Sequence, residues 1–165
     1  MPTPAHRTRV ITVSDRSAAG QREDRSGPLA AELLTAQGLD VDQVVVVPDG
    51  VLPVRTALVQ AVRDGVRLVF TTGGTGVGPR DATPEATAEA LEVRLDGVAE
   101  AIRRAGAEQV PTAVLSRGLV GLTSREPGAT LIVNAPGSTG GVRDAVAVVG
   151  PLVAHILDQV DGGDH

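Results

Sequence analysis

Short apolar runs alternate with longer amphipathic stretches along this chain of 165 residues, and most of the runs end in a polar or glycine-rich loop. Runs of this length suit buried strands, and the stretches between them suit helices that connect parallel strands. The pattern therefore predicts one α/β domain with a mostly parallel sheet. The expected strands are Val10–Val13, Val44–Val47, Leu68–Phe70, Ala113–Leu122 and Thr130–Asn134.

Five helices are expected between and after these strands. Thr83 is suited to cap a helix whose first position is Pro84, and Glu85 favours the positive end of the helix dipole. Pro151 lies inside the last apolar stretch, where it predicts a kink or a break. The expected helices cover Ser26 to Gly38, Val54 to Gly65, a stretch from Thr83, Val98 to Ala105, and Val142 to Val160.

The composition excludes several classes of site. There is no Lys and no Cys, which excludes a lysine Schiff base, a P-loop lysine, disulfides and cysteine-bound zinc. The net charge of -5 and a single aromatic residue, Phe70, argue against nucleic-acid binding. No apolar run approaches the roughly 20 residues of a membrane span. We expect a cytoplasmic protein with no membrane segment, a flexible N-terminus at 1–8, one domain at 9–160 and a tail at 161–165.

Four loops follow the four best strand candidates. They are Ser14-Asp15-Arg16, Pro48-Asp49-Gly50, the stretch from Thr72 to Asp81, and Pro136-Gly137-Ser138. In an open α/β sheet, ligands bind outside the carboxyl ends of the strands. If the strands are parallel, these loops converge on one crevice.

The run Thr72-Gly73-Gly74-Thr75-Gly76 is the sharpest motif. Glycines allow close backbone approach, so that consecutive N–H groups can face an anion. The run is not a P-loop, because Pro79-Arg80 stands where Lys-Ser/Thr is needed, and its glycine spacing does not fit a dinucleotide fingerprint. The alternative is a tight turn between a strand and a helix.

Two carboxylates lie on neighbouring loops. Asp81 precedes the helix start at Thr83, so it could cap that helix, and Asp49 could be a plain turn residue. Both could instead hold Mg²⁺ against phosphate oxygens, since Mg²⁺ prefers one or two carboxylates plus substrate phosphates.

The remaining candidates could bind phosphate or serve only the fold. Arg16 and Arg80 could pair with phosphate or be solvated surface charges. The turn Pro136–Ser138 could present N–H groups to an anion or simply join a strand to a helix. Ser116 could offer a hydroxyl or be an ordinary strand residue.

In this order and context the motifs resemble the MogA/MoaB family and the related G domain of gephyrin, from about Arg9 to Val160. The most diagnostic stretch is Thr72–Gly76 followed by Pro79–Ala86, and Ser14-Asp15-Arg16, Pro48-Asp49, Ser116-Arg117 and Asn134–Gly137 accompany it. The resemblance implies the MogA-like molybdopterin-binding fold, a three-layer α/β/α domain with a mostly parallel sheet and a small antiparallel element.

The resemblance also implies an activity, the transfer of AMP from Mg-ATP to the terminal phosphate of molybdopterin with release of pyrophosphate. Asp49 and Asp81 would then be the critical carboxylates, with Mg²⁺ as the metal. The expected nucleotide- and pterin-binding residues are Ser14, Asp15, Arg16, Thr72, Gly73, Gly74, Thr75, Gly76, Arg80, Ser116, Pro136, Gly137 and Ser138. The resemblance further implies a trimer or a hexamer, and a metal-insertion enzyme acting downstream.

One departure keeps an alternative open. After Pro136-Gly137 the transferases usually continue with Asn or Gln and Pro, whereas this chain reads Ser138-Thr139-Gly140-Gly141. A paralogue that binds molybdopterin or docks a partner without transferring AMP is therefore the second hypothesis. A third is an unrelated α/β nucleotide-binding protein.

Overall fold

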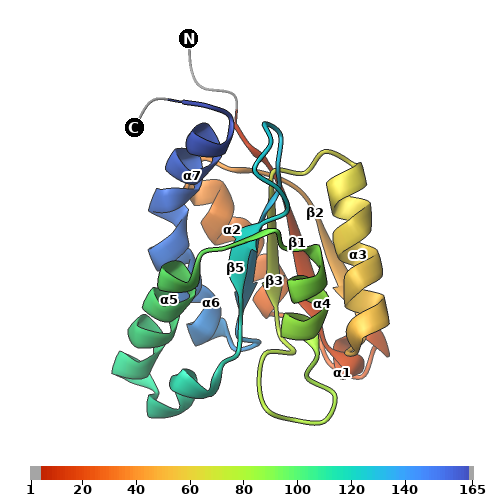
Figure 1. Cartoon of the computed structure of the whole chain (residues 1–165). Helices are drawn as coiled ribbons and strands as arrows, with labels where there is room; N and C mark the ends of the chain where they lie inside the picture. The colour runs from red at the N-terminus through yellow and green to blue at the C-terminus, as the bar shows by residue number, and fades with distance from the viewer. Residues whose placement is uncertain (1–4, 164–165) are drawn as a thin grey trace.

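The structure, a computed structural model, describes residues 5–163 and contains one six-stranded sheet in the order β2-β1-β3-β6-β5-β4 (Figure 1). The four strands β2, β1, β3 and β6 run parallel, whereas β5 is antiparallel to both of its neighbours. The strands are β1 (Arg7–Val13), β2 (Asp40–Val47), β3 (Leu68–Thr72), β4 (Val93–Arg94), β5 (Val120–Leu122) and β6 (Leu131–Ala135).

Helices cover both faces of the sheet, as Figure 1 shows. On one face α2 (Ser26–Ala36), α5 (Asp96–Gln109), α6 (Thr139–Val149) and α7 (Val153–Val160) enclose the larger core, which contains Phe70. On the other face α3 (Val51–Arg63) and α4 (Thr83–Ala90) enclose a smaller core around Val69 and Ile132. Neighbouring residues of β3 thus enter opposite cores, as a central strand requires. The three-layer α/β/α fold with an antiparallel element is confirmed.

The break expected at Pro151 is present. Helix α6 ends at Val149, a 3₁₀ turn η2 covers Gly150–Leu152, and α7 follows. Together Thr139–Val160 are long and apolar enough to cross a membrane by length and composition alone. However, their buried residues, such as Val146 and Leu157, belong to the larger core, so the segment packs as a core helix pair.

The expected strand Ala113–Leu122 is wrong over most of its length. Pro111–Leu115 form a 3₁₀ turn, η1, and only Val120–Leu122 join the sheet as β5. A short apolar run cannot distinguish a strand from a helical turn by periodicity. Here the backbone N–H of Arg117 donates to the carbonyl of Thr75, at 2.8 Å, which places this segment over the glycine loop.

Smaller differences concern boundaries and short elements. Strand β2 begins at Asp40, four residues before the apolar run, and β6 is displaced by one residue. The pattern did not predict β4 or the one-turn helix α1 (Asp15–Ala18), because neither contains an apolar run. Thr83 is not the cap of α4 but its first residue, and its hydroxyl donates to the carbonyl of Gly73 at 2.9 Å.

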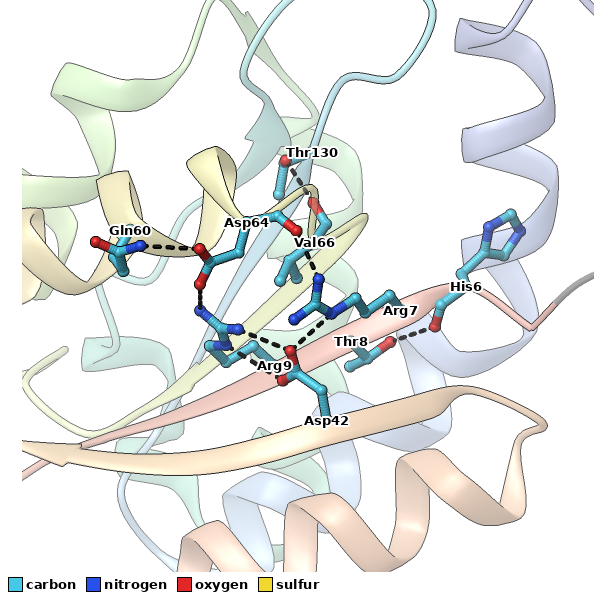
Figure 2. Close-up of polar contacts among 9 residues, drawn as sticks. All are labelled: His6, Arg7, Thr8, Arg9, Asp42, Gln60, Asp64, Val66 and Thr130. Atoms are coloured by element: carbon cyan, nitrogen blue, oxygen red, sulfur yellow. Dashed lines mark hydrogen bonds and ion pairs between the residues drawn. The ribbon is translucent and has the colours of Figure 1, made fainter.

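A buried arginine explains the polar start of β2. The side chain of Arg9 is only 4% exposed, and its guanidinium donates to both carboxylate oxygens of Asp42, at 3.2 and 2.7 Å, and to Asp64, at 2.7 Å (Figure 2). Arg7 also donates to Asp42, and Gln60 to Asp64, each at 2.8 Å. This cluster joins β1, β2 and the end of α3 at the amino ends of the strands.

The cluster predicts a loss of stability in acid. Burial raises the pKa of Asp42, but hydrogen bonds and charge from Arg9 and then Arg7 hold that pKa below its usual range. The hydrogen bond from Arg9 and then that from Gln60 likewise lower the pKa of Asp64. Carboxylates with lowered pKa values contribute stability above their unfolded pKa, about 4, and this stability is lost as the pH falls through their folded values.

We therefore expect the free energy of unfolding to fall below about pH 4 and to fall less steeply in Asp42→Asn. Binding of one proton on unfolding changes the free energy of unfolding by at most about 1.4 kcal/mol per pH unit, and by less where the carboxylate is partly hydrated. Urea unfolding between pH 2 and pH 7 measures this slope. Asp40→Asn, an exposed residue of the same strand, is the control, and an Asp42→Asn slope equal to the control's would contradict the prediction.

Candidate active site

The loops predicted to converge do so at the carboxyl ends of the parallel strands. The chain passes from β1 outward to β2 and then back to β3 on the other side of β1, so the strand order reverses between β1 and β3. Such a switch point is where open α/β sheets bind ligands. A cavity of about 620 Å³ lies there and is lined by Thr12, Val13, Ser14, Ser17, Arg22, Glu23, Asp24, Arg25, Ser26, Asp49, Thr72, Gly73, Gly74, Thr75, Gly76, Asp81, Gly137, Ser138 and Thr139.

Hydrogen bonds join the loops after β1 and β2. The backbone N–H of Asp15 donates to the Asp49 carboxylate at 2.9 Å, and the N–H of Asp49 donates to the Asp15 carboxylate at 3.1 Å. The N–H of Ser14 donates to the carbonyl of Val47, at 2.9 Å. Only one oxygen of Asp49, Oδ2, accepts in this exchange, and Asp49 lines the cavity. The carboxylate is thus fixed in place beside the cavity.

The glycine loop lies between the ends of β1 and β6. Gly73 has a φ of 102°, and a Cβ there would lie 2.2 Å from the carbonyl oxygen of Val13, so only glycine fits. The hydroxyl of Thr72 donates to the carbonyl of Pro136 at 2.8 Å, and the N–H of Gly73 donates to that of Ala135 at 3.0 Å. The loop is therefore more than a tight turn, because its residues line the cavity.

Asp81 lines the same cavity as Asp49. Its Oδ2 accepts from the N–H of Gly78 at 2.9 Å, and a Cβ on either Gly76 or Gly78 would come within 2.8 Å of that oxygen. Asp81 makes no hydrogen bond that caps α4, so the capping interpretation is wrong. Its carboxylate faces the cavity rather than the helix that follows it.

The donor set fits a magnesium ion completed by phosphates. Among the described residues there is no group of three or more Asp, Glu or His side chains that could hold a metal ion by themselves. Two carboxylates on one cavity, Asp49 and Asp81, match the small number of protein ligands that Mg²⁺ takes when substrate phosphates supply the rest.

The two arginine candidates differ in placement. Arg80 donates to both oxygens of the Asp15 carboxylate, each at 3.1 Å, and to the carbonyl of Asp49 at 2.9 Å. The hydrogen bond from Arg80 lowers the pKa of Asp15. Arg80 thus joins the glycine loop to the loops after β1 and β2. Arg16 is exposed on α1 and does not line the cavity, so the structure does not bring it to the other candidates.

The loop after β6 begins a capped helix. The hydroxyl of Ser138 accepts from the N–H of Gly141 at 3.0 Å, which makes Ser138 the N-cap of α6. Gly137 and Ser138 both line the cavity at this helix start. The loop is thus a strand-to-helix turn that also forms a wall of the cavity.

A second cavity of about 570 Å³ adjoins the first between α5, η1 and α6, and most of its lining surface is apolar. Thr75, Gly76 and Ser138 line both cavities. Two further candidates, Ser116 and Pro136, line only this second one. Most candidate residues therefore divide between two adjoining cavities, whereas Asp15, Arg16 and Arg80 line neither.

Sequence reasoning missed the segment Arg22–Ser26, which forms one wall of the first cavity. Asp24 accepts from the hydroxyl of Thr12 at 2.8 Å and from the N–H of Gly27 at 3.0 Å, so it joins the start of α2 to the end of β1. The signal was a run of four charged residues, Arg22-Glu23-Asp24-Arg25, directly before a predicted helix.

Known proteins are similar over nearly the whole chain. The sequence model of the family described as "Probable molybdopterin binding domain" matches residues 9–155. A molybdenum cofactor biosynthesis bifunctional protein of Synechococcus elongatus is 39% identical over 156 residues, which are 94% of this chain and 48% of that protein. A molybdopterin adenylyltransferase of Pyrococcus furiosus is 38% identical over 149 residues, which are 90% of this chain and 87% of that protein.

Solved structures agree with these sequence relatives. A molybdopterin biosynthesis protein from Mycobacterium abscessus is 47% identical, with a TM-score of 0.88 over 95% of this chain and 97% of that one. The chain spans about half the length of the first two curated relatives that it matches, both bifunctional proteins. The match to residues 9–155, supported by these relatives, shows that this chain belongs to the molybdopterin-binding domain family of molybdenum cofactor biosynthesis, the MogA/MoaB family that its loops resemble.

Proposed function

We propose that this chain is a nucleotidyltransferase that transfers AMP from Mg-ATP to the terminal phosphate of molybdopterin. The observation that carries the proposal is that Asp49 and Asp81 line one cavity together with the glycine loop. Relatives at 33–38% identity that are named molybdopterin adenylyltransferase support it. Family membership also rules out the hypothesis of an unrelated nucleotide-binding protein.

The two adjoining cavities suit a reaction between two phosphorylated substrates. The first is polar and contains the carboxylates, so it would hold the triphosphate of ATP. The second is mostly apolar and has room for a flat ring system. Since Thr75, Gly76 and Ser138 line both, the reacting phosphates would meet beside these residues.

The reaction is a displacement at the α-phosphorus of ATP. An oxygen of the molybdopterin phosphate forms a bond to that phosphorus, the bond to the β-phosphate oxygen breaks, and pyrophosphate leaves with the electron pair. Mg²⁺ held by Asp49 and Asp81 would neutralise charge on the leaving group. The backbone N–H groups of the glycine loop and the start of α6 would orient the phosphates, so that catalysis is mainly positioning and charge stabilisation.

An adenylylation assay tests the proposal. The purified chain, molybdopterin and Mg-ATP should yield pyrophosphate and adenylyl-molybdopterin in equal amounts. Omitting molybdopterin should abolish both products, which excludes a contaminating ATPase. Molybdopterin binding without release of pyrophosphate would contradict the proposal.

That outcome would favour the second hypothesis, a module that binds molybdopterin without transferring AMP. Its motivation is the sequence Ser138–Gly141, which departs from the usual transferase pattern. In the structure Ser138 nevertheless caps α6, and a Cβ on Gly141 would lie 2.7 Å from the ring of Pro136. These residues thus form a close-packed helix start that can still present N–H groups to a phosphate, so the departure in sequence is compatible with the transferase.

We further propose that residues 9–160 act as one domain in a cytoplasmic homotrimer or hexamer, with a metal-insertion enzyme acting on its product. Support comes from the family resemblance and from relatives about twice as long that are named bifunctional. Sedimentation equilibrium distinguishes the assemblies, and a monomer at micromolar concentration would contradict the proposed state.

A further inference from the structure

The segment that carries Asp81 contacts the rest of the protein through Arg80, which donates to the Asp15 carboxylate and to the carbonyl of Asp49. After Gly76 the chain leaves the cavity, and it returns at Asp81. Within this loop the N–H of Gly78 donates to Asp81 Oδ2 at 2.9 Å, and the N–H of Asp81 donates to the carbonyl of Gly78 at 3.1 Å. The residues from Val77 to Arg80 are exposed. The place of the Asp81 carboxylate therefore depends on the Arg80 contacts and on what holds the two ends of loop 76–81.

One residue from outside the loop contacts both of its ends. The Nε of Arg117 donates to the carbonyl of Gly76 at 2.9 Å, and Nη2 donates to the carbonyl of Asp81 at 3.0 Å. Nη1 pairs with Glu85 in the first turn of α4. The guanidinium thus joins the start of the loop, its end and the helix that follows.

The backbone of Arg117 is itself held. Its N–H donates to the carbonyl of Thr75 at 2.8 Å. Arg103 of α5 donates to the carbonyl of Gly118 at 3.0 Å and, more weakly, to that of Ser116 at 3.4 Å. The segment that presents Arg117 is therefore attached both to the glycine loop and to a helix of the larger core.

We propose that Arg117 is a positioning residue for the AMP transfer proposed above, on which this inference rests. It holds loop 76–81 and so determines where the Asp81 carboxylate lies, without touching a substrate. Arg117 lines neither cavity, and its three nitrogens already donate to protein oxygens. The role requires arginine, because a lysine ammonium cannot match three acceptors arranged around a planar fork.

Kinetics of substituted chains test this role. Arg117→Ala should lower kcat about ten- to hundredfold, since displacing a catalytic group by about 1 Å costs up to that much. Arg117→Lys should recover only a minor part of the loss. The double variant Arg117→Ala plus Asp81→Asn should be no slower than Asp81→Asn alone, because both changes remove the same contribution.

Arg55→Ala is the matched control, because Arg55 also pairs with a glutamate of α4, Glu89, at 3.0 Å, but lies away from the loop. It should keep wild-type turnover. Glu85→Ala should cost less than Arg117→Ala, because the carbonyls of Gly76 and Asp81 remain bound. Wild-type turnover in Arg117→Ala, full recovery by Arg117→Lys, or a double variant slower by the product of the two effects would overturn the proposal.

Amide hydrogen exchange separates this inference from the proposed function. In the ligand-free protein, Arg117→Ala should accelerate exchange at the N–H of Gly78, which donates to Asp81, by about tenfold or more. The reason is that opening of loop 76–81 no longer breaks the hydrogen bonds from Arg117. Arg55→Ala should leave this rate unchanged. If the wild-type chain transferred no AMP, the proposed function would fail, and exchange would still decide whether Arg117 holds the loop. Unchanged exchange at Gly78 would show that it does not.

Discussion

Replacing Asp81 by Asn is expected to lower turnover in the adenylylation assay by about 10²- to 10³-fold, the usual cost of losing one electrostatic contact made to the transition state. The change removes the negative charge but keeps the shape. The remaining oxygen can still accept from the N–H of Gly78, so that loop 76–81 should keep its conformation. The free energy of unfolding of this variant should therefore stay within about 0.5 kcal/mol of the wild-type value, as for most surface substitutions.

Initial rates of pyrophosphate release, measured across a range of Mg²⁺ concentrations, check this prediction. Asp81→Asn should also need more Mg²⁺ for half-maximal rate, because one of two proposed protein ligands is lost. The control is Glu89→Gln, which removes a carboxylate of α4 that forms only an exposed ion pair with Arg55. Wild-type turnover by the double variant Asp49→Asn plus Asp81→Asn would show that neither carboxylate holds the metal.

The position of these carboxylates was predictable because parallel strands end at the same edge of a sheet. If Val10–Val13 and Leu68–Phe70 are parallel strands of one sheet, the loops at Ser14 and Gly73 lie at the same edge, and in the structure these strands are neighbours. The glycine loop was predicted to line this crevice and it does, whereas its binding of an anion stays a prediction. The structure confirms the fold and the convergence of the four loops, whereas the roles of the individual residues stay predictions.

What could not be predicted depends on contacts between distant parts of the chain. Arg80 could be expected near phosphate or in solvent, but its donation to Asp15 depends on the exact path of loop 76–81. Likewise, Arg117 lies in a segment that the apolar pattern predicted as a strand. In the structure the contacts of Arg117 with Gly76 and Asp81 hold that segment outside the sheet. Side-chain pairing across 36 to 65 residues leaves no periodic signal in the sequence.

The other large effect concerns stability. Gly73→Ala should destabilise the fold by about 3–5 kcal/mol, the sum of the strain of a non-glycine residue at positive φ and of overpacking. The overpacking arises because the new Cβ would lie 2.2 Å from the carbonyl oxygen of Val13, a backbone atom that cannot move without displacing the end of β1. For a domain whose total stability is about 5–15 kcal/mol, this loss would lower the population of folded protein markedly.

Gly65→Ala isolates the contribution of the close contact. Gly65 has a φ of 75°, and a Cβ there would meet nothing within 4 Å, so this variant carries backbone strain alone. It should cost about 1 kcal/mol or slightly more. Urea unfolding of both variants gives the difference between their losses in free energy of unfolding. Equal losses would show that the end of β1 moves to make room for the added Cβ at little cost. A larger loss at Gly73 would instead show that the loops after β1 and β3 are packed against each other without spare room. The glycine loop that lines the cavity would then be rigid before any phosphate binds, as pre-organised catalysis requires.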